Sequence, residues 1–502
     1  MAQFAKLDPS TLKQLRTVDK RLVSYNVEMT EVTGGTFWKA YTDAQVDGTE
    51  EFPPIANWQD MGNLQQMYEP IDSRNPRLIK LAKELGTAWV RVSGTWANKT
   101  YYDFDGHTGG QVPEGFQNLL TKDQWTALLD FVKAIDGKLL VSVANCPGIH
   151  SANEPWDPTQ AKLLFDYSLD YGVPINAAEF TNESNLMAMS GLPAGYTAAD
   201  HARDHDLFGA WLRENYPECL FVGPCTCGDI DMFGMGMGDE KVGGGIGSAL
   251  QMVTTEELLG EYKEKMDVFS YHYYNGVSER GAAMGGHWPA EAALTEKYLG
   301  VAANCARQYI GRRDRYVPGG QMWVTESGDA GCGGNTWAST YMDVPRTLNE
   351  LGEFATVTDG IIFHNTLASS DYGYLKHGTF DPRPNYFAVL LWNRLMGQTV
   401  YDTGEEIREG VHVYCHSRKD GEEGYVYLVI NNSQTESTTV ELAKDAKRYT
   451  LSGDGKIRSR MMQLNGKALK LGENDELPEM NPVDEAAGTV ELAPATCTFF
   501  VM

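Results

Sequence analysis

The sequence predicts an α/β fold, a (β/α)8 TIM barrel followed by a C-terminal antiparallel β-sandwich domain. Short apolar runs alternate with amphipathic helical patterns over most of the chain, which is typical of a parallel barrel. Near residue 397 the pattern changes to short alternating runs separated by Asp, Gly and Asn turns, which is typical of a sandwich. An open doubly wound sheet is the alternative, but no GxGxxG or GxxxxGKS/T motif follows an early run.

Eight apolar runs are predicted to form the barrel strands, because each is bounded by polar residues or glycine and suits burial on both faces. They cover residues 21–29, 87–94, 138–146, 174–180, 219–225, 266–274, 321–327 and 359–367. Apolar residues recur at helical spacing between these runs, in residues 76–86, 122–135, 159–172, 200–216, 256–265, 290–311 and 343–351. Gly86 ends the first of these helices at the position of a C-terminal cap.

The chain is expected to divide into three parts. Residues 21–397 contain the strand–helix series and form the barrel. Residues 398–502 contain the alternating runs VHVYCHS, GYVYLVINN, TTVELA, RYTLSG and CTFFVM and form the sandwich. Residues 1–20 are expected to join this sandwich, because the edge of a sheet needs a covering segment.

The chain is strongly acidic, with 42 Lys and Arg residues against 68 Asp and Glu residues and a formal net charge of -26. A field of this sign repels nucleic acids and anionic membrane surfaces, so we expect neither as a partner. No apolar run is long enough to predict a membrane helix, and the N-terminal stretch MAQFAKLDPSTLKQL lacks an apolar signal core. We therefore expect a cytoplasmic protein, or a secreted or periplasmic one if a signal peptide has been removed.

The eight cysteines lie too far apart for a small disulfide framework. Cys225-Thr226-Cys227 lacks the two-residue spacer and the second pair of a zinc site. We therefore predict reduced thiols and no metal.

Two glutamates stand near the ends of apolar runs, Glu183 after residues 174–180 and Glu326 within residues 321–327. Because the strand ends of a parallel barrel meet at one mouth, we expect the two carboxylates to face each other. Carboxylates about 5–5.5 Å apart are the acid/base and the nucleophile of retaining glycoside hydrolysis. As the acid/base, Glu183 is expected to have a raised pKa, from desolvation and from the second carboxylate.

Each glutamate also has a plainer interpretation, with Glu183 at a turn that starts a helix and Glu326 at a flexible surface loop. Their placement after matching strands favours catalysis. Asn182 is then the expected donor to a substrate 2-hydroxyl. Trp96, Tyr372 and Tyr374 follow other strands and are expected to stack on a sugar face, with core packing as the alternative.

The chain resembles glycoside hydrolase family 79, the heparanase and β-glucuronidase family of retaining (β/α)8 hydrolases. The matching stretches are AKELGTAWVRVSGTW, PINAAEFTNESN, MDVFSYHYYNG, WVTESGDAGCGGNTWAST, GTFDPRPNYFAVLLWNRLMG and, in the sandwich, MMQLNGKALKLGENDELPEMNP and CTFFVM. The likeness spans nearly the whole chain, including the sandwich, where catalysis cannot explain it. It implies a retaining mechanism on a carbohydrate substrate, with no metal or organic cofactor.

The resemblance also assigns roles to single residues. It implies that Glu183 is the acid/base beside Asn182, that Glu326 is the nucleophile, and that Tyr273 donates to the nucleophile. It places further substrate contacts on Glu28, on Thr95, and on the backbone N–H groups of Gly333 and Gly334, which would bind a uronate carboxylate.

Two positions depart from the family pattern. Gly331 stands where several family members have a tyrosine that holds the uronate carboxylate, five positions after the nucleophile. The family's tyrosine after the eighth strand does not align cleanly, because Tyr372 and Tyr374 flank Gly373.

The sequence as a whole predicts a β-glucuronidase that releases terminal glucuronic acid. A β-glucosidase or β-xylosidase is the alternative that Gly331 supports. A heparanase-like endo-β-glucuronidase is less favoured, because an acidic protein repels a long sulfated chain. A non-catalytic carbohydrate-binding protein is disfavoured by the presence of both glutamates.

Overall fold

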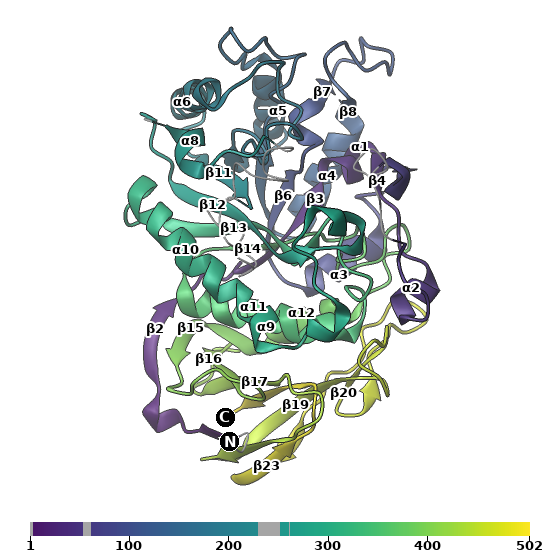
Figure 1. Cartoon of the computed structure of the whole chain (residues 1–502), viewed down its shortest axis with the longest axis vertical. Helices are drawn as coiled ribbons and strands as arrows, with labels where there is room; N and C mark the ends of the chain where they lie inside the picture. Colours follow the sequence, from purple (N-terminus) through teal and green to yellow (C-terminus); the bar gives the residue numbers. More distant parts are fainter. Residues whose placement is uncertain (1–3, 54–61, 229–250, 261) are drawn as a thin grey trace.

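Eight parallel strands close into a barrel in the computed structural model, which describes residues 4–53, 62–228, 251–260 and 262–502 (Figure 1). The strands follow one another around the ring in chain order. They are β3 (Val23–Glu28), β6 (Trp89–Ser93), β9 (Lys138–Ser142), β10 (Ile175–Glu179), β11 (Leu220–Cys227), β12 (Val268–Val277), β13 (Gln321–Gly331) and β14 (Ile362–His364). The predicted fold class is confirmed.

Strand alternation determines which side chains reach the barrel interior. In β6, Trp89 lies in an apolar cluster inside the barrel, whereas Val90 and Val92 belong to the core between strands and helices. Successive side chains of a strand point to opposite faces, so Arg91 and Ser93 also point inward, above Trp89. The interior is thus apolar at the level of Trp89 and polar nearer the C-terminal strand ends.

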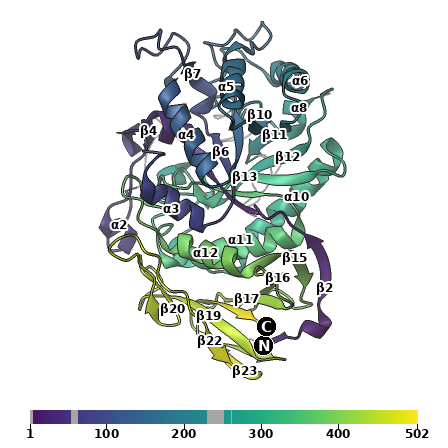
Figure 2. The same cartoon turned by 180° about the vertical axis from the view of Figure 1, so that it is seen from behind.

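An outer layer of helices covers the barrel (Figures 1 and 2). Its helices are α3 (Pro76–Glu84), α4 (Lys122–Ala134), α5 (Thr159–Asp170), α6 (Ala198–Asn215), α8 (Thr255–Leu259), α10 (Val301–Tyr316), α11 (Val344–Val357) and α12 (Pro384–Leu395). Among the described residues, no helix is both long and apolar enough to span a bilayer.

Two expected helices differ from the structure. The helix expected at 256–265 ends earlier, as α8, and residue 261 lies outside the described residues. The helix expected at 290–311 is interrupted, because the Thr295 side chain caps a separate short helix, α9 (Glu296–Leu299), before α10 begins.

Short elements in the loops complete the barrel region. They are α1 (Met29–Thr33) and α2 (Asp43–Asp47), the antiparallel pair β4 (Gly35–Trp38) and β5 (Gln65–Tyr68), and the parallel pair β7 (Thr100–Asp103) and β8 (Asn118–Thr121).

Two further sheets are formed by strands that follow the barrel in the chain and by the two N-terminal strands. The larger contains β2 (Lys13–Thr17), β15 (Met396–Asp402), β16 (His412–Arg418), β17 (Tyr425–Asn431), β24 (Thr496–Val501), β19 (Ala446–Gly453), β20 (Met462–Leu464), β21 (Lys467–Ala468) and β22 (Val483–Glu485). The smaller contains β1 (Phe4–Leu7), β18 (Thr438–Leu442) and β23 (Gly488–Leu492). The N-terminal strands β1 and β2 pair with β18 and β15, and the proposed division between residues 397 and 398 falls inside β15.

Helices α11 and α12 lie between the barrel and the larger sheet in both views (Figures 1 and 2). One buried cluster includes Leu348 and Phe354 of α11 together with Tyr414, Leu428 and Phe499 of the sheet. The barrel helices and the sandwich therefore share one continuous hydrophobic core.

Candidate active site

Glu326 reaches the barrel interior because β13 contains a β-bulge. In the pairing with β12, Val324 lies opposite Tyr271 and Glu326 opposite His272, so Thr325 is the extra residue. Without the bulge, strict alternation from the inward Trp323 would point Thr325 inward and Glu326 outward. The bulge re-aims Glu326, whose side chain is 7% exposed.

Two donors bind the Glu326 carboxylate. Arg91 Nη1 donates to Oε1 at 3.0 Å, and the Tyr274 hydroxyl donates to Oε2 at 2.7 Å. Burial, followed by the charge of Glu326, raises the pKa of Tyr274 well above its usual value, so this phenol keeps its proton and remains a donor.

The predicted role of Tyr273 is wrong. Its hydroxyl donates to Asn275, and its ring packs edge-on against Phe354 of α11 at 5.3 Å. Adjacent residues of a strand face opposite sides, so when Tyr274 faces the interior Tyr273 faces the helices. The donor to Glu326 is Tyr274.

Arg91 organises the centre of the site and was not singled out from the sequence. Its Nε donates to Glu179 Oε2 at 2.9 Å, and its Nη2 donates to Asn182 Oδ1 at 2.8 Å and lies 3.2 Å from His272 Nε2. The side chain is fully buried, and paired carboxylates offset the cost of burying its charge. An arginine at an inward position of an apolar strand is the sequence signal that marks it.

His272 connects the two glutamates. Its Nδ1 lies 2.8 Å from Glu183 Oε1 and 3.6 Å from Glu326 Oε2. Because the Arg91 guanidinium can only donate, Nε2 of His272 accepts, and the ring proton is on Nδ1, facing the carboxylates. One oxygen of each glutamate lies within 4.8 Å of the other, a separation close to that of retaining glycosidases and shorter than that of inverting ones.

Glu183 lies four residues beyond the end of β10, on a turn where its own φ is 46°. Its side chain is 17% exposed, so it lies closer to solvent than Glu326. Burial raises the pKa of Glu183, but the donors around it, His272 first and then Cys227 and Arg91, together leave it below the usual value. The expected raised pKa of Glu183 is therefore wrong, since the donors outweigh desolvation.

Asn182 adjoins Glu183 in the predicted position. Its Oδ1 accepts from Arg91 and, at 3.2 Å, from Ser93 Oγ, which leaves Nδ2 as its donor side. Its backbone N–H donates to Asn98 Oδ1 at 2.9 Å. These contacts fix the amide orientation beside the two glutamates.

Glu28 ends β3 and also belongs to the site. Burial, then the charges of Glu326 and Glu31, raises its pKa well above the usual range. Its Oε2 is buried without a hydrogen-bond partner among the described residues, and it lies so close to Gly94 that a Cβ there would be 1.8 Å away. An unpaired buried carboxyl oxygen suits a contact to a substrate hydroxyl. Thr95, half-buried, lies two residues after the end of β6 at the same end of the barrel.

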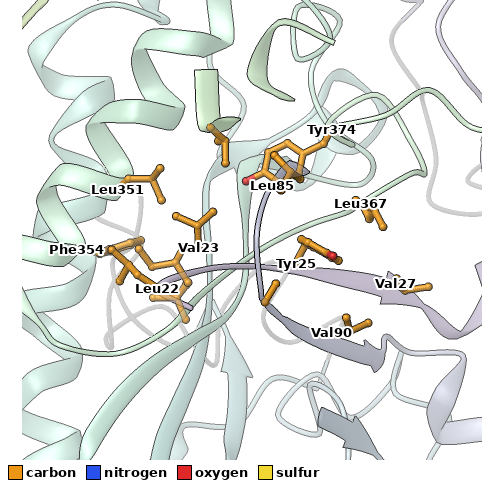
Figure 3. Close-up of a cluster of buried hydrophobic side chains, with 14 of the residues drawn as sticks. Leu22, Val23, Tyr25, Val27, Leu85, Val90, Leu351, Phe354, Leu367 and Tyr374 are labelled. Atoms are coloured by element: carbon orange, nitrogen blue, oxygen red, sulfur yellow. The ribbon is translucent and has the colours of Figure 1, made fainter. Parts of the chain in front are cut away.

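Tyr372 reaches the site, but Tyr374 does not. The Tyr372 hydroxyl accepts from Asn365 Nδ2 at 3.0 Å, and that amide also donates to the Tyr274 hydroxyl at 2.9 Å. Tyr374 stacks on His364 at 3.9 Å and lies in the hydrophobic cluster with Tyr25 and Leu367 (Figure 3). The prediction that Tyr374 stacks on a sugar is therefore wrong, because the Gly373 turn points the rings of Tyr372 and Tyr374 to different sides.

The loop with Gly333 and Gly334 is held by Arg280. This buried arginine pairs with Asp371 at 2.6 Å and donates to the carbonyls of Cys332 and Gly334, both at 3.1 Å. A Cβ at Gly333 would lie 2.8 Å from Trp38 and 2.9 Å from Arg280, which explains the glycine there. The Gly334 N–H already donates to the Ala330 carbonyl at 3.1 Å. The prediction that this N–H binds a uronate carboxylate is therefore wrong.

Three groups of side chains among the described residues bring ligand atoms of the kind that hold metals within 4.8 Å. One group is His272 with the two candidate catalytic glutamates, Glu183 and Glu326. Another is His272 with Glu179 and Cys225, and in this group Glu179 already pairs with the Arg91 guanidinium. The third is Asp103, which ends β7, with Asp105 and His107 in the loop that follows.

No family model matches this chain. Heparanase-like protein 1 of Arabidopsis thaliana is 23% identical over 487 residues, which cover 86% of this chain and 85% of that protein. The baicalin-β-D-glucuronidase of Scutellaria baicalensis is 25% identical over 359 residues, 68% of this chain and 62% of that protein. The hyaluronoglucuronidase of Hirudo nipponia is 23% identical over 494 residues, 90% of this chain and 94% of that protein.

A similar solved structure is the 4-O-α-L-rhamnosyl-β-D-glucuronidase of Fusarium oxysporum. It superposes with a TM-score of 0.67 at 11% identity, over 99% of this chain and 98% of that chain. At this identity the likeness concerns the fold, and it extends over the barrel and the sandwich together.

Proposed function

This chain belongs to glycoside hydrolase family 79, the heparanase and β-glucuronidase family, and we propose that it is a retaining β-glucuronidase. The observation that supports the proposal most directly is the pair of carboxylates on one histidine. Glu183 and Glu326 lie within 4.8 Å of each other through His272, on a barrel whose strand ends meet there.

Glu326 is the proposed nucleophile. Arg91 and Tyr274 hold one oxygen each, so the carboxylate is fixed before a substrate arrives. In the first step a Glu326 oxygen attacks the anomeric carbon, while protonated Glu183 gives its proton to the leaving oxygen. The bond to the aglycone breaks as the glycosyl–enzyme ester forms.

Glu183 is the proposed acid/base. In the second step its carboxylate takes a proton from water, which attacks the anomeric carbon and releases Glu326. The lowered pKa of Glu183 favours this base role, because the donors around it stabilise the carboxylate form. Glu28 and Asn182 are the proposed contacts to sugar hydroxyls.

Terminal glucuronides are the proposed substrates. The relatives named above include proteins named for baicalin glucuronide and for hyaluronan, which differ in chain length. The net charge of -26 disfavours a long polyanionic chain, so we propose exo-cleavage.

A β-glucosidase or β-xylosidase is the second candidate. Gly331 provides no side chain for a substrate carboxylate, and the Gly334 N–H is already bonded within its loop. Both observations weaken the recognition of a uronate without affecting the two glutamates.

The deciding experiment is the hydrolysis of p-nitrophenyl β-glucuronide beside the matching glucoside and xyloside. We expect turnover of the glucuronide and its loss by several orders of magnitude in Glu326→Ala, with a cooperative thermal transition that shows that the variant is folded. Preference for the glucoside or xyloside would establish the second candidate instead. Equal turnover by wild type and Glu326→Ala would contradict the mechanism.

A further inference from the structure

One buried asparagine attaches the turn that carries Glu183 to the loop after β6. Asn98 lies in the short 3-10 helix η3 (Ala97–Lys99) and is fully buried. Its Oδ1 accepts from the Asn182 backbone N–H at 2.9 Å. Its Nδ2 donates to the Asn182 carbonyl at 2.9 Å and to the Ser190 carbonyl at 3.0 Å. Asn98 thus links the two ends of the Glu183 turn.

These contacts determine which way the Asn98 amide faces. A carboxamide has an acceptor oxygen and an NH2 group with two hydrogens. The oxygen faces an N–H group and the NH2 group faces two carbonyls, so the reversed orientation would place like groups opposite each other. An ionised aspartate has the same shape but cannot donate to the two carbonyls, so the position requires asparagine.

Ser190 extends the attachment to Glu183 itself. Its hydroxyl donates to the Glu183 carbonyl at 2.5 Å. The peptide group before the Glu183 Cα is therefore held by Asn98 through the Asn182 carbonyl. The peptide group after this Cα is held by Ser190, whose own carbonyl accepts from Asn98.

The Glu183 turn needs such support. Its φ of 46° lies in the left-handed region, which costs a non-glycine residue free energy and persists only where surrounding contacts impose it. The turn packs tightly on the Asn98 loop, because a Cβ at Gly191 would lie 2.3 Å from the Lys99 side chain. A carboxyl group that must first give a proton to the leaving oxygen and then take one from water also needs a fixed direction.

We propose that Asn98 positions Glu183 for proton transfer, by holding the backbone of Asn182 and Ser190 on either side of it. The inference rests on the proposed acid/base role of Glu183. Asn98 is a positioning residue, because it acts on the substrate only through the Glu183 turn. Without it the turn relaxes, and the carboxyl group loses its direction towards the leaving oxygen.

Leaving groups of different basicity make this role measurable. Phenolate is a poor leaving group and requires the proton from Glu183, whereas 2,4-dinitrophenolate leaves without one. The Asn182 side chain is held separately by Arg91 and Ser93, so its proposed sugar contact should persist. Loss of Asn98 should therefore slow the phenyl glycoside far more than the dinitrophenyl glycoside.

The test measures kcat/KM on the phenyl and 2,4-dinitrophenyl β-glycosides of the sugar that wild type hydrolyses. It compares wild type with Asn98→Ala, Ser190→Ala, Glu183→Gln and Asn349→Ala. Ser190→Ala removes only a hydroxyl, so it takes the place of Asn98→Ala if that variant does not fold.

Asn349 on α11 provides the matched control. It is also a buried asparagine whose side chain is hydrogen-bonded through both its oxygen and its NH2 group, and its partners are Leu299, His412 and Tyr414. Its loss should lower the thermal stability without changing the ratio of the two kcat/KM values.

We expect Asn98→Ala to lower kcat/KM for the phenyl glycoside by roughly ten- to a hundredfold. The dinitrophenyl value should fall by less than about threefold, because this substrate does not need the proton. Ser190→Ala should give the same pattern more weakly, and Glu183→Gln more strongly. A wild-type ratio in Asn98→Ala, or an equal change of the ratio in Asn349→Ala, would overturn the positioning role.

The same experiment separates this inference from the function on which it rests. A wild type that hydrolyses none of the aryl glycosides, or a Glu183→Gln variant with the wild-type ratio, would overturn the proposed function and the inference together. A leaving-group effect in Glu183→Gln that is absent from Asn98→Ala would overturn the inference alone.

Discussion

The inner face of β12 presents His272 and Tyr274 to the candidate catalytic carboxylates, whereas Tyr273 between them faces α11. The Tyr274 hydroxyl is 2.7 Å from Glu326 and also accepts from Asn365 at 2.9 Å. It therefore has a fixed direction, and its proton points at the oxygen that changes charge during the reaction. Substitutions at Tyr274 and at the adjacent Tyr273 can therefore be compared as a matched pair.

Tyr274→Phe is expected to lower kcat/KM by roughly ten- to a hundredfold, because a hydrogen bond to a charged group contributes about 1.5 to 3 kcal/mol. Tyr273→Phe removes a hydroxyl on the opposite face and should keep kcat/KM within about twofold of wild type. Steady-state kinetics on the aryl glycoside that wild type accepts provide the measurement. An equal loss in both variants would contradict the alternation argument.

The residue scale also shows what the sequence could predict about the site. Asn182, Glu183 and Glu326 were predicted because each is polar and stands near the end of an apolar run, whereas Glu28 was predicted from the resemblance to glycoside hydrolase family 79. The structure brings these four together with Tyr372 around Arg91 and Asn365. Their catalytic and binding roles remain predictions.

Other site features could not be predicted, because they depend on contacts between strands. The bulge at Thr325 leaves no mark in the sequence, yet it decides that Glu326 points inward. Strand alternation gives the inward direction of Tyr274 only once the direction of another β12 side chain is known. That reference comes only from the structure, in which Val268 lies in the apolar cluster inside the barrel.

At the scale of single elements, α6 contains a buried histidine pair at one-turn spacing. His205 is fully buried, neither of its ring nitrogens has a hydrogen bond within the part of the chain that the structure describes, and its ring lies 4.7 Å from Phe221. His201, by contrast, contacts the Leu258 carbonyl through Nδ1 at 3.2 Å. Burial lowers the pKa of His201 to about 4 and that of His205 well below its usual value, so both rings are neutral in the folded protein.

These histidines make the folded state sensitive to acid. In the unfolded chain a histidine takes up its proton near pH 6.5, whereas in the folded chain His201 does so only near pH 4. The neutral histidines therefore cost no free energy of unfolding above about pH 6.5. Below this pH the free energy of unfolding falls as the pH is lowered towards the folded pKa values.

His205→Leu is expected to raise the free energy of unfolding at pH 8 by about 1 to 3 kcal/mol, because two unpaired buried nitrogens are removed. The gain should be larger at pH 5, where the proton uptake of unfolded His205 is also removed. His201→Leu, the matched variant, leaves the Leu258 carbonyl unpaired and should lose stability at pH 8. Urea unfolding at the two pH values measures both, and a loss for His205→Leu at pH 5 would contradict the account.

On the scale of the whole molecule, the fold class was predictable because strand and helix periodicities differ and alternate regularly. The contact between the barrel and the sandwich could not be predicted, because it depends on which faces of α11 and α12 meet the larger sheet. The sequence of α11 nevertheless holds a sign of this contact. Gly352 is buried in the middle of the helix, where glycine is unfavourable unless close packing requires it.

Gly352→Ala is expected to destabilise the protein by about 1 to 3 kcal/mol, since its Cβ would lie 2.4 Å from the buried ring of Tyr414 on β16. Gly311→Ala is the control, because a Cβ at this exposed position of α10 meets no described residue within 4 Å. There the alanine should stabilise the helix by about 0.5 to 1 kcal/mol. Because the barrel helices and the sandwich share one core, thermal unfolding of Gly352→Ala should remain a single transition at a lower temperature. Separate barrel and sandwich transitions, or equal shifts in the two variants, would contradict the view that this contact joins the two parts.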